Sequence, residues 1–407
     1  MVTLATGDFG SKRGMGPRFG RDIKSVAVAR LVSEMGDELA LIALIFRLKD
    51  SGTGAVSLLL AVFAATRILL SPLTGSIVDR FATRGLIASV SCLQFAVAAT
   101  LAFIQGWFVY PLVFLLAVGG SIIGPAWQSF VAHVVPPHDL SRTYAFIQSY
   151  RSVAIAAGAG VGGFVVDRFG IQLALLLDAM SFLFVAGVAA ALTTQRVPTD
   201  NPRGITGFSR GFVVFLRTPV LLWSLLLLAS FNMSAGIIEV LSAFFVSDEL
   251  HGGASDYGVI LGALGASMFA TGVVLSRIKL RQRDTTLLMA SAVTSALGMF
   301  AYGMSTNIAY AVLAFVLNGI GLTGLHVFGT PVLVRHTRDE ERGRVFAASS
   351  SVTMGGMLLA TGIAGAIGEM FPPRPIIASA GLACLTFAFV GGTKIRRNDR
   401  LVEPTSG

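Results

Sequence analysis

Long apolar runs divide this chain and set the strongest limit on its fold. Twelve runs lie near residues 24–47, 55–78, 86–104, 108–132, 143–166, 171–193, 219–246, 255–276, 284–303, 306–334, 344–368 and 374–393. A helix needs about 20 apolar residues to cross a bilayer, and most of these runs reach that length. Charged residues make up only 13% of the chain, about half of the roughly 25% that is typical of soluble domains. The sequence therefore predicts an all-α integral membrane protein with twelve transmembrane helices.

Three pairs of matching segments, half a chain length apart, indicate an internal repeat. The pairs are 75–84 with 272–281, 141–169 with 343–371, and Gly36 with Gly236. Within the second pair, Asp167 aligns with Glu369. Internal repeats are typical of transporter folds built from two related halves, with the substrate site between them near the midplane.

We therefore expect two six-helix halves related by pseudo-two-fold symmetry. The predicted units are a cytoplasmic tail at 1–23, the first half at 24–193, a cytoplasmic linker at 194–218, the second half at 219–393 and a cytoplasmic tail at 394–407. The linker is recognised by its Pro, Gly and Arg residues, which interrupt the apolar pattern.

The placement of positive charge predicts the orientation of the chain in the membrane. The net charge is +9, and most of the 31 Lys and Arg residues fall on one side if twelve spans begin inside the cell. The opposite turns hold Arg47, Lys49, Arg168 and Arg374. Cytoplasmic loops carry such an excess. We therefore expect a multi-pass protein of the inner (cytoplasmic) cell membrane with both termini in the cytoplasm, and no nucleic-acid partner.

The first predicted span carries four ionisable residues on one face. Arg30, Glu34, Asp37 and Glu38 lie within a stripe about 100° wide on a helix, and Arg30 and Glu34 have the i,i+4 spacing of an ion pair. Arg67, in the second span, is predicted to lie at the same depth as a partner for Asp37 or Glu34. Ionisable groups inside a membrane face the protein interior or a water-filled cavity. We interpret the group as a substrate or proton site; the alternative is an ion-pair cluster that only fixes helix packing.

Other spans add fewer polar residues to the predicted cavity. Gln148 and Arg151 share a face of the fifth span, and Asn232 and Glu239 share a face of the seventh. Asp178, in the sixth span, is interpreted as a helix-packing acid. The cationic partners expected for Asp37 and Glu34 are therefore Arg67 and Arg151.

The fifth span also has a patch of small residues. Gly158, Gly160, Gly162 and Gly163 would let neighbouring backbones approach closely. The patch predicts either a pivot for alternating access or a tight helix contact, and the sequence leaves both readings open.

A charged segment between the second and third runs predicts a turn at the membrane surface. Gly75 begins it, and Asp79, Arg80 and Arg84 carry its charges. Unpaired charges at bilayer depth cost several kcal/mol. We expect these four residues to form a gating motif at the surface.

The sequence lacks the motifs of the main catalytic and nucleotide-binding classes. It has no phosphate-binding Gly-x4-Gly-Lys-Ser/Thr loop, no HExxH and no zinc-spaced Cys/His cluster. Its two cysteines, Cys92 and Cys384, fall within apolar runs. We therefore expect a protein that is not an enzyme, binds no metal or cofactor, and draws energy from a proton gradient through carboxylates such as Asp37.

Several segments resemble the major facilitator superfamily of transporters. The Gly75-x3-Asp79-Arg80-x3-Arg84 segment resembles the superfamily's signature between spans two and three, with Ala82 in place of the usual second Gly. Other segments are similar to a bacterial exporter branch that includes enterobactin, macrolide and multidrug exporters. These are Ser33-x2-Gly36-Asp37, 177–182 and 342–346. Ala159 stands where the superfamily's antiporter signature in span five has proline.

The resemblance implies a secondary transporter that works by alternating access, with Asp79, Arg80 and Arg84 as a cytoplasmic charge relay. Together with the membrane carboxylates it predicts proton-coupled efflux of a small amphipathic compound such as a drug, antibiotic or siderophore. We expect a monomer in the lipid bilayer with a small-molecule substrate. The alternatives are an importer or a lipid or metabolite flippase on the same fold, and a non-transporting membrane sensor.

Overall fold

A computed structural model gives the fold of the chain. The structure describes residues 17–135, 140–194, 214–277, 284–337 and 342–402. Within these ranges the side chains of Gly75, Asp79, Gln148 and Arg151 lie outside the described part, so the predictions made for them remain predictions.

The described residues form twelve long α-helices and no strand. The first six are α1 (Pro17–Lys49), α2 (Thr53–Arg80), α3 (Thr83–Leu101), α4 (Val109–Val134), α5 (Leu140–Phe169) and α6 (Ile171–Ala191). The second six are α8 (Pro219–Phe244), α9 (Ala254–Arg277), α10 (Asp284–Gly303), α11 (Ile308–Arg335), α12 (Arg342–Gly368) and α13 (Pro373–Val402). Two short turns, η1 (Gly106–Phe108) and η2 (Phe245–Glu249), precede α4 and follow α8. Among the described residues, ten segments are long and apolar enough to cross a membrane. The all-α membrane fold is therefore confirmed, and twelve helices are consistent with twelve spans.

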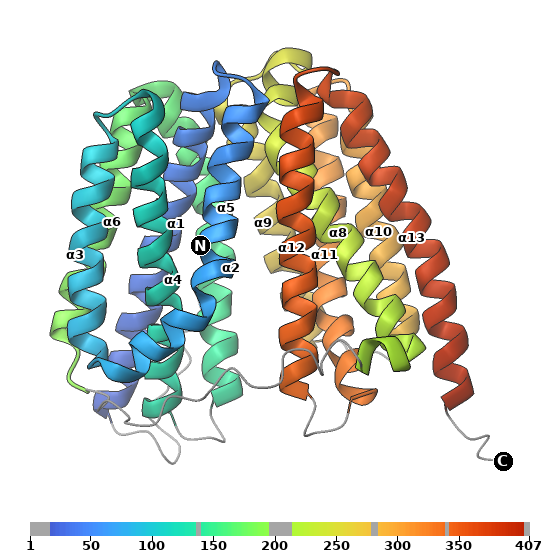
Figure 1. Cartoon of the computed structure of the whole chain (residues 1–407), viewed down its shortest axis with the longest axis horizontal. Coiled ribbons are helices and arrows are strands. Elements are labelled where there is room, and N and C mark those ends of the chain that lie inside the picture. Colours follow the sequence, from blue (N-terminus) through green and yellow to red (C-terminus); the bar gives the residue numbers. More distant parts are fainter. Residues whose placement is uncertain (1–16, 136–139, 195–213, 278–283, 338–341, 403–407) are drawn as a thin grey trace.

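The helices are arranged as two groups of six (Figure 1). In the first group α1 packs on α5 and α6, and α3 packs on α4 and α6. In the second group α8 packs on α12 and α13, and α10 packs on α11 and α13. The main contacts between the groups are α5 with α9 and α2 with α12. These two pairs are equivalent under the repeat that the sequence predicts.

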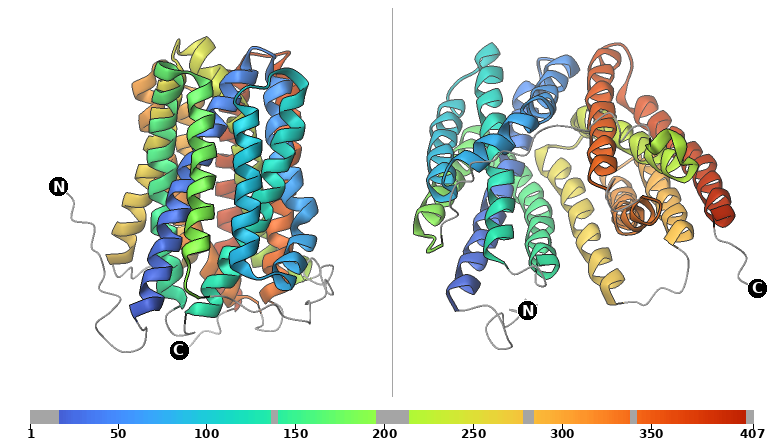
Figure 2. Two further views of the ribbon diagram at one scale, coloured as in Figure 1. Left: turned by 90° about the vertical axis from the view of Figure 1, so that its left-hand side faces the viewer. Right: turned by 60° about the horizontal axis from the view of Figure 1, so that its bottom comes forward.

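The two groups meet at one end of the molecule and separate toward the other. Figure 1 shows the helices approaching each other at the top, whereas the start of α1 and the end of α13 lie at the bottom, and Figure 2 shows the same splaying from a second direction. We refer to these as the converging end, where α1 passes into α2, and the diverging end, where α2 passes into α3.

Helix boundaries at the converging end follow from local backbone chemistry. Gly52 and Gly170 precede α2 and α6 with φ values of 95° and 88°, a conformation that glycine adopts without a steric penalty. Asn307 caps α11, because its side chain accepts a hydrogen bond of 3.0 Å from the backbone N–H of Tyr310. At the diverging end, Pro219 begins α8, where its missing N–H would have no helical partner.

Some helices extend beyond the apolar runs. α1 begins at Pro17 and α13 ends at Val402, so both continue into segments predicted as tails. The charged segment 75–84 is largely helical, because α2 continues to Arg80 and the chain turns at Phe81 and Ala82. The chain therefore turns within the charged segment, as predicted, but the turn is short because α2 extends to Arg80. A helix can carry charge once it has passed the apolar layer, and a basic residue in the last turn interacts favourably with the helix dipole.

Candidate functional site

Charged residues from both six-helix groups interact where the groups meet. The guanidinium of Arg67, on α2, attracts the carboxylate of Glu239, on α8. The hydroxyl of Tyr257, on α9, interacts electrostatically with Glu239 and with Glu38, on α1. Tyr257 is buried, with only 2% of its surface exposed. Four helices, two from each group, therefore contribute to one polar cluster, which we call the central cluster (Glu38, Arg67, Glu239 and Tyr257).

Arg30 and Glu34 form the i,i+4 ion pair that their spacing predicts. Arg30 Nη2 lies 2.9 Å from Glu34 Oε1, and both side chains are about four-fifths buried, with 22% and 19% of their surface exposed. Arg30 and Glu34 therefore pair within α1, whereas Asp37 and Glu38 of the same stripe interact with groups on other helices. Arg67 interacts with Glu239 of the other group, a partner that the sequence did not indicate.

Asp37 lies beside a second acid, Asp178. Asp178 projects from α6 toward α1, is only 1% exposed, and interacts electrostatically with Asp37. Asp37 itself is exposed. The sequence assigned Asp178 to helix packing, and only the packing of α1 on α6 reveals that the two acids are neighbours.

The remaining predicted polar residues take more local roles. The side chain of Asn232 donates a hydrogen bond of 2.8 Å to the carbonyl of Leu228 in its own helix. Arg80 is exposed, and Arg84 donates to the carbonyl of Ala190 at the end of α6. Arg84 therefore connects the turn after α2 to α6.

The glycines of α5 face different neighbours. A Cβ added to Gly158 or Gly162 would lie within 3.1 Å of the α1 backbone. A Cβ on Gly163 would overlap the carbonyl oxygen of Ala254 on α9, whereas one on Gly160 would have no atom within 4 Å. The patch thus makes close contacts on two sides, with α1 in the same group and α9 in the other.

Polar contacts join the two groups at the converging end. Lys49 Nζ, at the end of α1, lies 2.9 Å from Asp248 Oδ1 in η2. The hydroxyls of Thr53 and Ser57, on α2, donate to carbonyls of Gly365 and Thr361 on α12, at 2.8 and 2.7 Å. Thr53 and Ser57 are buried hydroxyls, and a Thr or Ser at the start of an apolar helix has no distinctive sequence signal, so sequence reasoning missed these contacts.

Two acids that the internal repeat relates lie at equivalent positions there. Asp167, at the end of α5, accepts hydrogen bonds from the backbone N–H groups of Ala254 at 3.0 Å and Ser255 at 2.7 Å, in the first turn of α9. Glu369, after α12, lies against Gly54 in the first turn of α2, with Oε1 2.7 Å from the position of an added Cβ. Each acid lies at the positive end of a helix of the opposite group. The alignment of Asp167 with Glu369 was the sequence signal for this pair.

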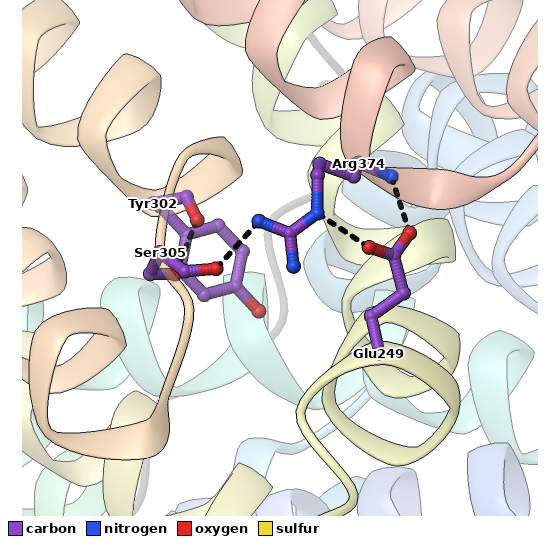
Figure 3. A network of polar contacts seen from close by, with 4 residues as sticks. All are labelled: Glu249, Tyr302, Ser305 and Arg374. Atoms are coloured by element: carbon purple, nitrogen blue, oxygen red, sulfur yellow. Dashed lines mark hydrogen bonds and ion pairs between the residues drawn. The ribbon is translucent and has the colours of Figure 1, made fainter.

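The second group has its own polar network at this end (Figure 3). Arg374 donates to Glu249 through its backbone N–H at 3.0 Å and through Nε at 2.6 Å. Its Nη1 donates to the carbonyl of Ser305 at 2.8 Å, and its guanidinium lies 5.3 Å from the ring centre of Phe245. Arg374 therefore ties η2, the end of α10 and the start of α13 together.

The family model of transmembrane secretion effectors matches residues 18–400 of this chain. The chain belongs to the major facilitator superfamily. Members of the superfamily are multi-pass membrane transporters rather than enzymes, and the family implies a small-molecule substrate.

Curated relatives of this superfamily member are distant. An uncharacterised MFS-type transporter of Bacillus subtilis, YvqJ, is 22% identical over 379 residues, 89% of each chain. Multidrug resistance protein 1 of Bacillus subtilis is 29% identical over 52% of this chain and 54% of its own. Quinolone resistance protein NorA of Staphylococcus aureus is 26% identical over 53% of this chain and 55% of its own.

Solved structures support the superfamily fold. A crystal structure of the peptide transporter POT in complex with alafosfalin matches with a TM-score of 0.78 at 13% identity, covering 96% of this chain and 97% of that one. A bacterial homologue of the human lysosomal transporter Spinster, in an inward-facing and unoccupied conformation, matches with a TM-score of 0.68 at 13% identity, covering 95% and 98%.

Proposed function

We propose that this protein is a secondary transporter that exports a small amphipathic compound, such as a drug, antibiotic or siderophore, in exchange for protons. The observation that carries the proposal is the central cluster, in which Glu239 and Tyr257 of one six-helix group interact with Arg67 and Glu38, respectively, of the other. Carboxylates between two moving bodies can change charge when a proton binds, and can thereby alter the attraction between those bodies. Asp37 and Glu34 are proposed as further coupling groups, with Arg67 and Arg151 as their cationic partners.

Export is the favoured direction because of the relatives. Two of them are named for resistance to drugs, Multidrug resistance protein 1 and the quinolone resistance protein NorA. The motifs at Gly36-Asp37, 177–182 and 342–346 point to the same exporter branch. We further propose that the protein is a monomer of the bacterial cell membrane with both termini in the cytoplasm. In this proposal Gly75, Asp79, Arg80 and Arg84 gate the cytoplasmic side, and the α5 glycines serve as the pivot.

The test is accumulation of a fluoroquinolone and of a siderophore in cells that express wild type, Asp37→Asn or Glu239→Gln, with and without a protonophore. Wild type is expected to lower accumulation of at least one compound. Either substitution, or the protonophore, is expected to restore the level of cells that lack the protein, because the coupling proton is lost. Asp50→Asn is the matched control, since Asp50 is an exposed carboxylate at the converging end.

Membrane expression of each variant is measured in the same cells. Normal export by well-expressed Asp37→Asn and Glu239→Gln would show that neither carboxylate couples transport to protons. Raised accumulation with wild type would instead identify an importer.

A further inference from the structure

Asp178 is a buried acid that the proposed coupling group leaves unused. Its carboxyl is 1% exposed, and its Oδ1 has no hydrogen bond of ordinary geometry to any described residue. Ser181, one turn further along α6, is 5% exposed, and its hydroxyl oxygen likewise has no hydrogen bond of ordinary geometry to any described residue. An ionised carboxylate without partners is costly to bury, at several kcal/mol, so a structural acid at this place needs an explanation.

Helix α1 approaches α6 closely at this acid. A Cβ on Gly36 would lie 2.7 Å from Asp178 Oδ1 and 2.6 Å from Ser181 Oγ. No side chain larger than that of glycine fits there without movement. The close approach brings the next residue, Asp37, near enough to Asp178 for the two carboxyl groups to interact electrostatically.

In the part of the chain that the structure describes, the helices that pack on α6 bring few charged groups to this pair. Three helices pack on α6, namely α1, α3 and α5. On α1, Arg30 is bonded to Glu34. On α3, the buried polar side chains are Thr83, Ser91 and Gln94, all uncharged, and Gln94 donates to the carbonyl of Leu116. On α5, the side chain of Arg151 lies outside the described part. Among the described side chains, Asp37 is the charged group that acts on Asp178.

We propose that Asp37 and Asp178 together hold one exchangeable proton, with Asp178 as the buried store and Asp37 as the group that exchanges it with the substrate path. Two carboxyl groups this close resist ionising together. Because Asp37 is exposed and Asp178 is buried, the proton resides on Asp178 and can pass to the Asp37 carboxylate, leaving Asp178 ionised. No other bond forms or breaks. The role of this transfer in transport rests on the proposed function, whereas the shared proton does not.

The proton is measured directly by infrared spectroscopy of the purified full chain in lipid bilayers. The carbonyl stretch of a protonated carboxylic acid is separate from that of a carboxylate. Wild type is expected to show a protonated acid at neutral pH, and Asp178→Asn is expected to lose a signal equal to one carboxyl group. Asp50→Asn is the matched control and is expected to keep it.

Asp37→Asn supplies a second, independent reading. Removing the neighbouring negative charge makes ionisation of Asp178 easier, so its signal is expected to disappear at a lower pH than in wild type. An unchanged signal in Asp178→Asn, or an unchanged titration in Asp37→Asn, overturns the proposal. If Asp178→Asn does not fold, the Asp37→Asn titration decides alone.

Transport separates this proposal from the proposed function. Loss of the signal in Asp178→Asn, together with normal export by Asp37→Asn, would support the shared proton and reject proton-coupled export through Asp37. An unchanged infrared signal in Asp178→Asn, together with loss of export in Asp37→Asn, would reject the shared proton and support proton-coupled export through Asp37.

Discussion

Asp22, near the start of α1, ties the two ends of the first six-helix group together. Its carboxylate accepts hydrogen bonds from the hydroxyls of Thr193 and Thr194, each at 2.9 Å, and from their backbone N–H groups. Burial alone would raise the pKa of Asp22, but these hydrogen bonds outweigh it and hold the pKa below its ordinary value of 3.8. The residue lies before the first apolar run, so this is a contact outside the membrane layer.

The lowered pKa of Asp22 predicts a pH-dependent stability. The ionised carboxylate is favoured in the folded state, so its contribution is fully present above pH 3.8 and is lost as the pH falls through the folded pKa. We expect Asp22→Asn to destabilise the protein by about 1–3 kcal/mol at neutral pH. The difference from wild type should vanish in strong acid.

Thermal unfolding in detergent at several pH values would measure this difference. Asp50→Asn, an exposed acid, controls for the loss of a negative charge. A difference from wild type that stays constant down to the most acidic condition would contradict the assignment.

At this scale the sequence predicted residue types better than partners. The acidic stripe of α1 was recognisable because ionisable residues are rare in apolar runs. The partners Glu239, Tyr257 and Asp178 were not, because each comes from a distant helix whose rotation and depth depend on packing. A one-turn error in depth, 5.4 Å, is enough to separate an ion pair.

Helix α5 packs closely against one helix of each group. Its glycines contact α1 on one side and α9 on the other, and the α9 contact is reciprocal. A Cβ on Gly258 would lie 2.5 Å from the carbonyl oxygen of Ala159. The two helices therefore touch backbone to backbone at the converging end, as small residues allow in membrane helices.

This contact predicts different effects for two alanine substitutions in one helix. Gly163→Ala would force α5 and α9 apart, because the new methyl group meets the Ala254 backbone, at a cost of about 1–3 kcal/mol for the closed arrangement. Gly160→Ala has open space and should be neutral, or stabilising by less than about 1 kcal/mol. Spin labels at Gln172 and His251, with Cys92 and Cys384 replaced, would report the separation of the groups. Equal label-to-label distances in the two variants would rule out a role for the α5–α9 contact in closure of the converging end.

The helices themselves were largely predictable, because each must bury about 20 apolar residues in lipid and the runs show this directly. Their ends were less so. α1, α2 and α13 continue past the apolar runs into charged sequence, where hydrogen bonding within the helix and contacts such as that of Asp22 decide the boundary. A hydropathy pattern shows neither these hydrogen bonds nor these contacts.

In the whole molecule, closure of the converging end depends on contacts that come in pairs. Asp167 binds the start of α9, and Glu369 lies at the start of α2. Opening the converging end must separate both acids from the helix dipoles that attract them. Each such interaction is worth about 0.3–1 kcal/mol at an exposed helix end.

We therefore expect the double variant Asp167→Asn/Glu369→Gln to favour opening at the converging end more than either single variant. The measurement is the rate of disulfide cross-linking between cysteines placed by Lys49→Cys and Asp248→Cys, which should fall in the order wild type, single variants, double variant. Native Cys92 and Cys384 are replaced first, and Asp50→Asn is the matched control. A double variant that cross-links as fast as wild type would exclude these acids as closing contacts.

The paired acids also bear on how a chain of this shape could arise. Two identical six-helix chains facing each other across a two-fold axis would form an isologous interface, in which one acid and one helix start make the same contact twice. Here both contacts lie in a single polypeptide, with Asp in one and Glu in the other. The halves have thus diverged in side-chain length while each still supplies a negative charge to the other, which is the trace expected of a duplicated gene that began as a homodimer.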